Sequence, residues 1–131
     1  MSETAAAPAL LDAWPYARFL GARLEAGVAV LPFAERLIGN PILPALHGGV
    51  VASFLELAAL ARLGAEGRRA RTIDITVDYL RPAKPLTTYA EARVLKLGRR
   101  AANLAVEAWQ DDRTSPVAAL RGHFMILGKV G

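Results

Sequence analysis

The sequence has 131 residues, enough for one domain with a single hydrophobic core. Hydrophobic residues make up 53% of it and the formal net charge is +4, a mild basic excess without the aromatic–basic interleaving or motifs typical of nucleic-acid binding. The lack of cysteine excludes a disulfide scaffold, a cysteine-ligated zinc site and thiol catalysis. The apolar fraction indicates that the domain buries surface against a partner, most simply a second copy of itself.

The first half of the chain predicts a short helix, a pair of strands and one long helix. Apolar residues at helical spacing indicate an amphipathic helix within residues 8–19. Residues 22–33 alternate as a strand with an internal turn, and residues 37 and 38 suggest a short strand before a proline-containing loop. The nearly all-apolar run at residues 48–63 predicts the one long helix.

In the second half the hydrophobic period changes from about 3.6 to about 2, which predicts strands. Residues 66–71, EGRRAR, are interpreted as a basic turn. The stretch TIDITVDYL then alternates, with four apolar residues on one face: Ile73, Ile75, Val77 and Tyr79. Three more strands are expected at residues 87–97, 102–110 and 117–127.

Consecutive strands with short connections form an antiparallel sheet, and a long apolar helix must be covered on most sides. We therefore expect an α+β fold in which an antiparallel sheet wraps around one long central helix. A helix lying flat on an open sheet is the alternative, which the strand lengths disfavour. Residues 1–20 would form an N-terminal segment with the short helix, and residues 21–131 would form the single main domain.

The start of the chain, MSETAAAPALLDAW, has no basic segment followed by a long apolar run, as a signal peptide would. The longest apolar stretch, residues 50–61, is too short to span a bilayer and contains Glu56. We therefore expect a cytoplasmic protein that does not enter a membrane.

The stretch LHGGVVASFLE, residues 46–56, opens the long helix and carries the most information about function. If the helix begins at Gly48 or Gly49, its first amides lack acceptors within the helix and lie at the positive end of its dipole. Uncovered amides of this kind can stabilise an acyl oxygen, although two glycines would equally suit a tight turn. His47 could orient a substrate oxygen or only bind the loop.

Glu56 is the single acid in this apolar helix. Three of its four neighbours at helical spacing are small, so a groove along this face could admit a thin chain; the four are Ala52, Ser53, Ala59 and Leu60. A carboxylate placed there can attack a thioester or activate water. The alternative is that Glu56 marks the one edge of the helix that faces water.

Other catalytic patterns are missing from the sequence. It has no HExxH, GxGxxG or GxSxG motif, and two histidines without a cluster of acids offer no metal site. His123 shares a face of the last strand with Arg121 and Met125, and we interpret it as structural.

The HGG stretch with an acid nine residues after the histidine, followed by TIDITVDYLRPA, ARVLKLGRRAANLAVEAWQDD and VAALRGHFMIL, resembles PaaI-like hotdog-fold acyl-CoA thioesterases. The resemblance runs from about residue 22 to the end. It implies the hotdog fold and a homodimer paired edge to edge, able to associate into a dimer of dimers. The active sites would lie at the dimer interface, with an acyl-CoA substrate and no metal or cofactor.

The resemblance also implies roles for single residues. The N–H of Gly49 would polarise the thioester carbonyl, and Glu56 of the partner subunit would act as general base or nucleophile. His47 and Asn40 would position the carbonyl or water. Two positions depart from the family pattern. Many members have aspartate at the acid position, and the polar residue that members carry six before the histidine is Pro41 here, with Asn40 one place earlier.

The remaining expectations concern the substrate. Gly48 and Ser53 would contact it, and three arginines would bind the phosphates of CoA unless they are ordinary exposed turn residues: Arg81, Arg99 and Arg100. The predicted activity is hydrolysis of a small aryl or medium-chain acyl-CoA. The alternative is a hotdog module that binds acyl-CoA or an acyl chain without catalysis. A hotdog hydratase is disfavoured because its Asp–His pair has a different spacing.

Overall fold

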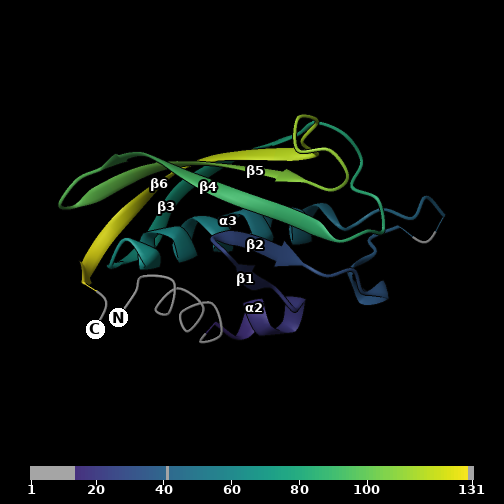
Figure 1. Ribbon diagram of the computed structural model, residues 1–131, viewed down its shortest axis with the longest axis horizontal. Helices are drawn as coiled ribbons and strands as arrows, with labels where there is room; N and C mark the ends of the chain where they lie inside the picture. Colours follow the sequence, from purple (N-terminus) through teal and green to yellow (C-terminus); the bar gives the residue numbers. More distant parts are fainter. Residues whose placement is uncertain (1–13, 41, 130–131) are drawn as a thin grey trace.

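The computed structural model of the chain describes residues 14–40 and 42–129 (Figure 1). The predicted helical residues 8–13 and Pro41 lie outside this part. The elements in chain order are the helix α2 (Pro15–Leu20), the strands β1 (Arg23–Glu25) and β2 (Val28–Leu31), the 3₁₀ helix η1 (Glu35–Leu37), the helix α3 (Gly48–Ala65), and the strands β3 (Arg68–Tyr79), β4 (Thr88–Leu97), β5 (Ala101–Trp109) and β6 (Ala118–Lys129).

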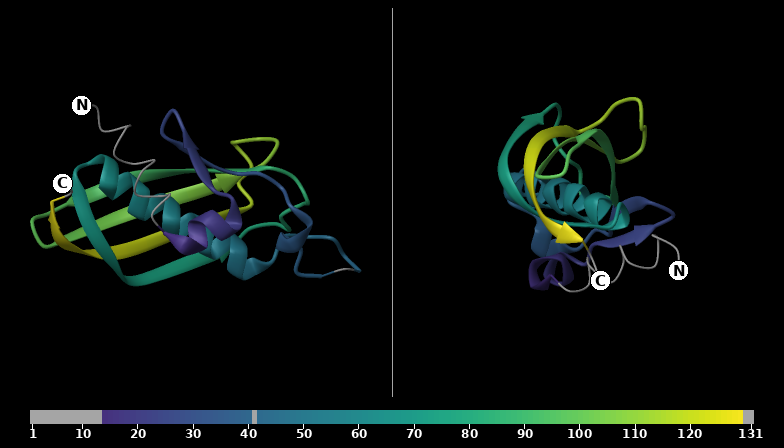
Figure 2. Two further views of the ribbon diagram at one scale, coloured as in Figure 1. Left: turned by 90° about the horizontal axis from the view of Figure 1, so that it is seen from below. Right: turned by 90° about the vertical axis from the view of Figure 1, so that its left-hand side faces the viewer.

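The strands form one sheet in the order β1-β2-β4-β5-β6-β3, and every neighbouring pair is antiparallel. Viewed along α3, the sheet curls around the helix (Figure 2, right), so the predicted fold is confirmed. The core lies between them, where Phe54 of α3 and Phe124 and Leu104 of the sheet are fully buried. The 12-residue strand β3 ends the sheet, because it pairs with β6 on one side only.

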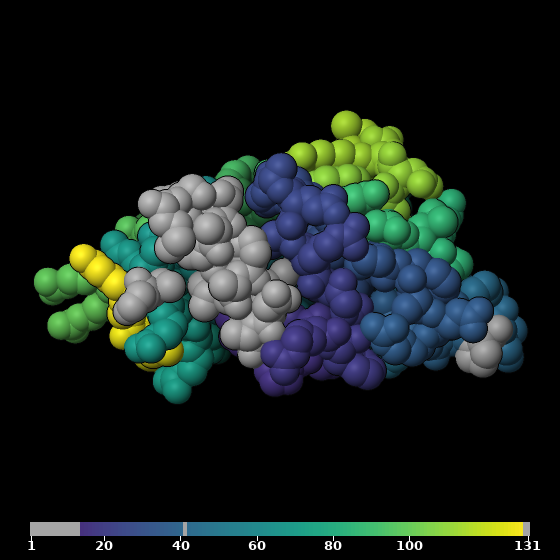
Figure 3. All heavy atoms as spheres, turned by 60° about the horizontal axis from the view of Figure 1, so that its bottom comes forward, coloured from purple at the N-terminus to yellow at the C-terminus, as the bar shows by residue number. Residues whose placement is uncertain are grey.

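The N-terminal elements cover the side of α3 that the sheet leaves open. Helix α2 starts at Pro15, whose missing N–H costs nothing in the first turn, and buries Ala17 and Leu20 in the core. The guanidinium of Arg36 donates to the carbonyl oxygen of Phe19 and holds the end of α2. In Figure 3, α2 and β1–β2 (purple to blue) form one surface that continues to the loop before α3.

The predicted strand at residues 37 and 38 is wrong. The N–H of Leu37 donates to Ala34 and that of Ile38 to Glu35, which makes a 3₁₀ turn that buries Leu37. Ile38 forms only a single bridge, to Leu46. Two apolar residues in a row fit a buried turn as well as a strand, and the sequence pattern does not separate them.

The start of β3 also differs from the prediction. The turn after α3 takes up only Glu66 and Gly67, and the arginines expected in it begin the strand. Thr72 pairs with Phe124 and Asp74 with His123, so the intervening Ile73 is an extra residue in a β-bulge. The bulge removes Ile73 from the inner face and leaves it 54% exposed.

Among the described residues, α3 is the one helix long and apolar enough to cross a membrane by length and composition, and half of its apolar window is buried inside the fold. It runs two residues beyond the predicted end and includes Gly64. The same composition is typical of a core helix, and its buried residues pack on the curled sheet.

Candidate active site at the start of helix α3

His47 caps the first turn of α3. Its Nδ1 accepts a hydrogen bond from the N–H of Gly49 at 2.9 Å, and its carbonyl oxygen accepts from Val50 and Val51. Because Nδ1 is an acceptor here, the neutral ring carries its proton on Nε2. The expectation that both first amides are uncovered is therefore wrong for Gly49. Within the part of the chain that the structure describes, the N–H of Gly48 has no acceptor.

The missing side chain at Gly49 is what lets the imidazole lie across it. A Cβ on Gly49 would stand 3.1 Å from Nδ1 and 3.3 Å from Cε1 of His47, closer than most real contacts. Glycine at position 49 therefore makes room for the ring of His47, which binds the Gly49 N–H, and does not leave that N–H uncovered. An acyl oxygen that binds Gly49 must replace His47 as the acceptor.

Glu56 lies two turns further along α3 and is half-buried. The hydroxyl of Thr72, on the edge strand β3, donates to Oε2 of Glu56 at 2.6 Å, a short bond typical of a hydroxyl on a carboxylate. Sequence reasoning missed Thr72, because its inward orientation depends on the bulge at Ile73. This contact orients the carboxylate, while Glu56 still lies on a partly exposed edge of α3.

The accessible stripe of α3 consists of Gly49, Ser53, Glu56 and Leu60, which recur at helical spacing and are all exposed or partly buried. Ala52 borders the stripe, so its first two turns carry only small side chains, as the sequence predicted. Glu56 and Gly49 share this stripe but lie about 10 Å apart along the helix axis. A single carbonyl group therefore cannot contact both residues of one protomer.

A cavity of about 400 Å³ adjoins the start of α3 and brings two predicted residues together, Gly48 and Arg81. Its walls come from the helix start, the end of β3 and the turn after it, and they are largely apolar: Leu46, Val51, Leu80 and Val117. The Nε of Arg81 donates to the carbonyl oxygen of Pro116 at 2.9 Å. This bond fixes the guanidinium at the rim, where its charge adds to the Thr114 hydrogen bonds that lower the pKa of Asp112. Among the described residues its other N–H groups have no hydrogen-bond acceptor, so an anion could bind them.

The other predicted arginines lie elsewhere. Arg99 and Arg100 occupy the β4–β5 hairpin, at the opposite end of the molecule from the start of α3 (Figure 1). The carbonyl oxygen of Arg100 accepts from the N–H of Ile126, whose partner across the sheet is Ala70 near the beginning of β3. Within one protomer the two arginines are thus remote from Arg81 and Gly48.

Asn40 binds its own loop. Its Oδ1 accepts from the N–H of Ile42 at 2.9 Å and more weakly from that of Leu43, which closes the turn before α3. The oxygen that was expected to position a carbonyl or water is therefore engaged within the loop. The role of Asn40 in a site stays a prediction.

The same loop packs closely on His47 through Gly39, and this contact makes a prediction about stability. A Cβ on Gly39 would lie 2.9 Å from the Cα of His47, so Gly39→Ala must displace the backbone that carries the cap. We expect it to lower the free energy of unfolding by about 1–3 kcal/mol in urea denaturation. Gly48→Ala is the matched control, because its Cβ would meet Tyr79 at an ordinary 3.5 Å. Equal midpoints for the two variants would contradict the steric argument.

The loop that anchors Arg81 contains a carboxylate with a shifted pKa. The hydroxyl and the N–H of Thr114 both donate to Asp112, and these bonds, the hydroxyl first, lower the pKa of Asp112 below 3.8. Since the pKa of Asp112 is depressed in the folded state, its ionised carboxylate stabilises the fold at pH values above the ordinary pKa. This stabilisation is lost as the pH falls through the folded-state pKa.

In an NMR titration, Thr114→Ala should therefore raise the pKa of Asp112 toward 3.8, whereas Thr114→Ser should leave it low because serine keeps the hydroxyl. The same pKa in the wild type and in Thr114→Ala would show that the hydroxyl contact is not the main cause of the shift.

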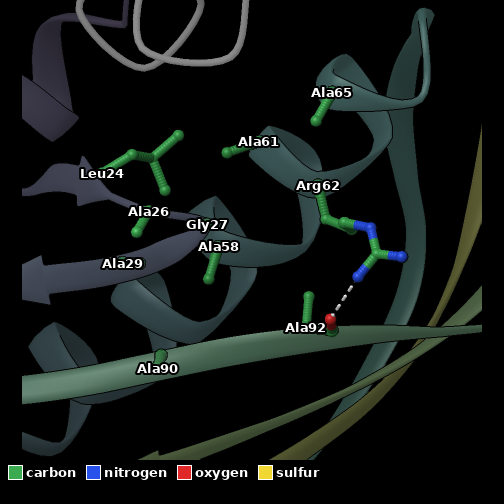
Figure 4. A pocket seen from close by; sticks show the side chains of 10 residues that line it. All are labelled: Leu24, Ala26, Gly27, Ala29, Ala58, Ala61, Arg62, Ala65, Ala90 and Ala92. Carbon is green, nitrogen blue, oxygen red and sulfur yellow. Dashed lines mark hydrogen bonds between the residues drawn. The ribbon is translucent and has the colours of Figure 1, made fainter. Parts of the chain in front are cut away.

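A second cavity, of about 90 Å³, lies on the opposite face of α3 from Glu56 and is lined mainly by alanines (Figure 4). Arg62 stands at its side and donates to the carbonyl oxygen of Ala92 at 2.8 Å. This cavity contains none of the predicted site residues.

On the outer face of the sheet, His123 pairs with Asp74 at 2.7 Å, which fits its structural interpretation. Across the described ranges, no three side chains of His, Cys, Asp or Glu cluster as metal ligands would.

An antiparallel sheet curled around one helix, with an acid and a glycine-rich start on the exposed stripe of that helix, defines a hotdog-fold protein. Residues 43–117 match the family model of the thioesterase superfamily. The chain belongs to this superfamily, which makes it a thioester hydrolase, and the resemblance to PaaI-like hotdog thioesterases is confirmed.

Individual relatives agree with this assignment. The chain is 34% identical to the medium/long-chain acyl-CoA thioesterase YigI of Salmonella typhimurium over 120 residues, covering 76% of this chain and 77% of the relative. A structure from Pseudomonas aeruginosa, 26% identical, superposes with a TM-score of 0.83 over 94% of this chain and 98% of that one. The PaaI protein of Escherichia coli, 23% identical, gives a TM-score of 0.83 over 98% and 96%, a likeness in fold alone.

Proposed function

We propose that the protein hydrolyses acyl-CoA thioesters at a site that two protomers build together. The observation that carries the proposal is the placement of Gly49 and Glu56 on one accessible stripe of α3, about 10 Å apart. If a two-fold axis runs perpendicular to α3 and passes between the levels of Gly49 and Glu56, the two copies of α3 are antiparallel and the glycine-rich start of one lies beside the acid of the other. Each dimer then has two equivalent sites.

The edge of the sheet supports this dimer. In the part of the chain that the structure describes, no strand pairs with the outer edge of the 12-residue β3, and such an edge is a template for another strand. Thr72, the partner of Glu56, lies near the middle of β3. A copy that pairs along β3 would therefore bring its own α3 close to Glu56. A homodimer is the assembly we propose, and a dimer of dimers would add a further interface.

In the reaction, the carbonyl oxygen of the thioester replaces His47 as the acceptor of the Gly49 N–H and also reaches the open N–H of Gly48. Glu56 of the other protomer takes a proton from water, whose oxygen attacks the carbonyl carbon. The tetrahedral intermediate then loses the C–S bond, and the proton held by Glu56 passes to the departing sulfur, so a carboxylic acid and the CoA thiol are released. If Glu56 attacks instead, an anhydride forms first and water cleaves it.

We infer a medium-chain acyl group rather than an aryl group. The similarity to YigI, a medium/long-chain acyl-CoA thioesterase, supports a straight chain. The cavity beside Gly48 is lined by the ring of Tyr79 as well as by aliphatic side chains. Arg81 at the rim of this cavity is a binding residue for the phosphates of CoA. Arg99 and Arg100 could serve only a site to which another protomer contributes.

The test is thiol release from a panel of acyl-CoAs, from butanoyl to palmitoyl together with phenylacetyl and 4-hydroxybenzoyl. We expect turnover with a maximum among the medium-chain substrates. A maximum with the aryl substrates would reverse the inference about the acyl group but keep the activity. Tight binding across the panel without turnover would favour the alternative, a non-catalytic module that binds acyl-CoA.

A further inference from the structure

The peptide unit that joins Gly48 to Gly49 is held at both ends by side chains from outside the helix. Its N–H, which belongs to Gly49, donates to Nδ1 of His47 at 2.9 Å. Its carbonyl oxygen, which belongs to Gly48, accepts a hydrogen bond from the hydroxyl of Tyr79, also at 2.9 Å. This is the peptide unit whose N–H would polarise the thioester carbonyl in the proposed function.

Tyr79 reaches this peptide from the edge of the sheet. It is the last residue of β3, and its ring lies directly against Gly48, where an added Cβ would be 3.5 Å from the hydroxyl oxygen and 3.6 Å from two ring carbons. The sequence pattern assigned Tyr79 to the inner face with Ile75 and Val77, yet it is 58% exposed. Core packing therefore does not account for an aromatic ring here; the ring lines the cavity beside Gly48, and its hydroxyl binds the carbonyl oxygen of Gly48.

The two contacts differ in what happens to them when substrate binds. His47 must give up the Gly49 N–H to the acyl oxygen, because one N–H has one good acceptor at a time. Tyr79 can keep its bond, since the carbonyl oxygen of Gly48 has two lone pairs and serves the helix with the other. Among the described residues, Tyr79 is then the one side chain outside α3 that still fixes the plane of this peptide.

We propose that Tyr79 is a positioning residue for the thioesterase reaction. Its hydroxyl fixes the direction of the Gly49 N–H and, by hydrogen bonding to the carbonyl of the same peptide, polarises that N–H as a donor. The effect grows as negative charge develops on the acyl oxygen, so it acts on the transition state more than on the bound substrate. This inference rests on the proposed function.

Tyr79→Phe tests it, because the ring and its packing on Gly48 are kept and only the hydroxyl is lost. We expect kcat to fall about three- to tenfold while KM changes less than about twofold. The matched control is Tyr89→Phe, which removes a hydroxyl from a ring stacked on Trp109 and should leave both constants at wild-type values. An unchanged kcat in Tyr79→Phe overturns the proposal, and a raised KM at constant kcat would make the hydroxyl a substrate contact instead.

A second readout separates this inference from the proposed function. In ¹⁵N–¹H spectra of the free protein, Tyr79→Phe should shift the amide proton of Gly49 upfield, because the peptide loses its polarising partner. Tyr89→Phe should not move that signal. If the wild type hydrolyses no acyl-CoA, the proposed function fails and the positioning role of Tyr79 in that reaction falls with it. An unmoved Gly49 signal would show in either case that the hydroxyl does not act on this peptide.

Discussion

Replacing Glu56 with glutamine is expected to lower the kcat of acyl-CoA hydrolysis by about a thousandfold, because the variant loses the group that takes the proton from water or attacks the thioester. Glutamine keeps the shape of the side chain, and its carbonyl oxygen can still accept the hydrogen bond from Thr72, which Glu56 accepts at 2.6 Å. The fold and the oligomer should therefore be unchanged in size-exclusion chromatography and thermal unfolding. Thiol release under saturating substrate measures the loss.

Two other variants serve as controls, one expected to have no effect and one expected to have a moderate effect. Glu66→Gln changes another acid of the same helix region, one that pairs with Arg62 at 3.1 Å, and should leave turnover at the wild-type level. Thr72→Val keeps the volume of the side chain but removes the hydroxyl that orients Glu56, and we expect a loss of about tenfold. Wild-type turnover in Glu56→Gln would remove Glu56 from the mechanism altogether.

The sequence was sufficient for the fold because its signals were long and regular. The nearly all-apolar run of α3 and the strands around the hairpin at residues 98–100 were predicted to within about two residues. One error occurred where a single residue changes the pattern. Nothing in the alternation of TIDITVDYL marks Ile73 as the extra residue, since a bulge arises from the pairing with β6.

The candidate site was predictable in its residue types but not in its contacts. Gly49, His47 and Glu56 could be selected from their order along one helix. The hydrogen bond from Gly49 to Nδ1 of His47 depends on a loop whose Gly39 lies against the histidine, and the orientation of Thr72 depends on the bulge. The bond from Thr72 joins residues 16 apart in the chain, and the cap on Gly49, although local, depends on packing against Gly39. The apolar pattern of α3 carries no signal for either contact.

Two inactive variants should restore activity to each other when they share one dimer. In the first chain Glu56→Gln removes the acid; in the second Gly49→Val fills the space at the helix start, where even a Cβ would come 3.1 Å from His47. Each homodimer should be inactive. In a heterodimer purified with two different tags, one site combines both defects and the other combines an intact Glu56 with an intact Gly49. About half of the wild-type turnover per dimer is therefore expected.

The experiment distinguishes a site that two protomers share from a site that lies within one protomer. If Glu56 and Gly49 of one chain served the same thioester, every site of the heterodimer would carry one defect and no activity would return. The separation of about 10 Å along the helix argues against that arrangement, because the glutamate side chain cannot span two helical turns. Recovery of activity would also show that the Gly49→Val chain folds, since an unfolded chain could not lend its Glu56 to the partner.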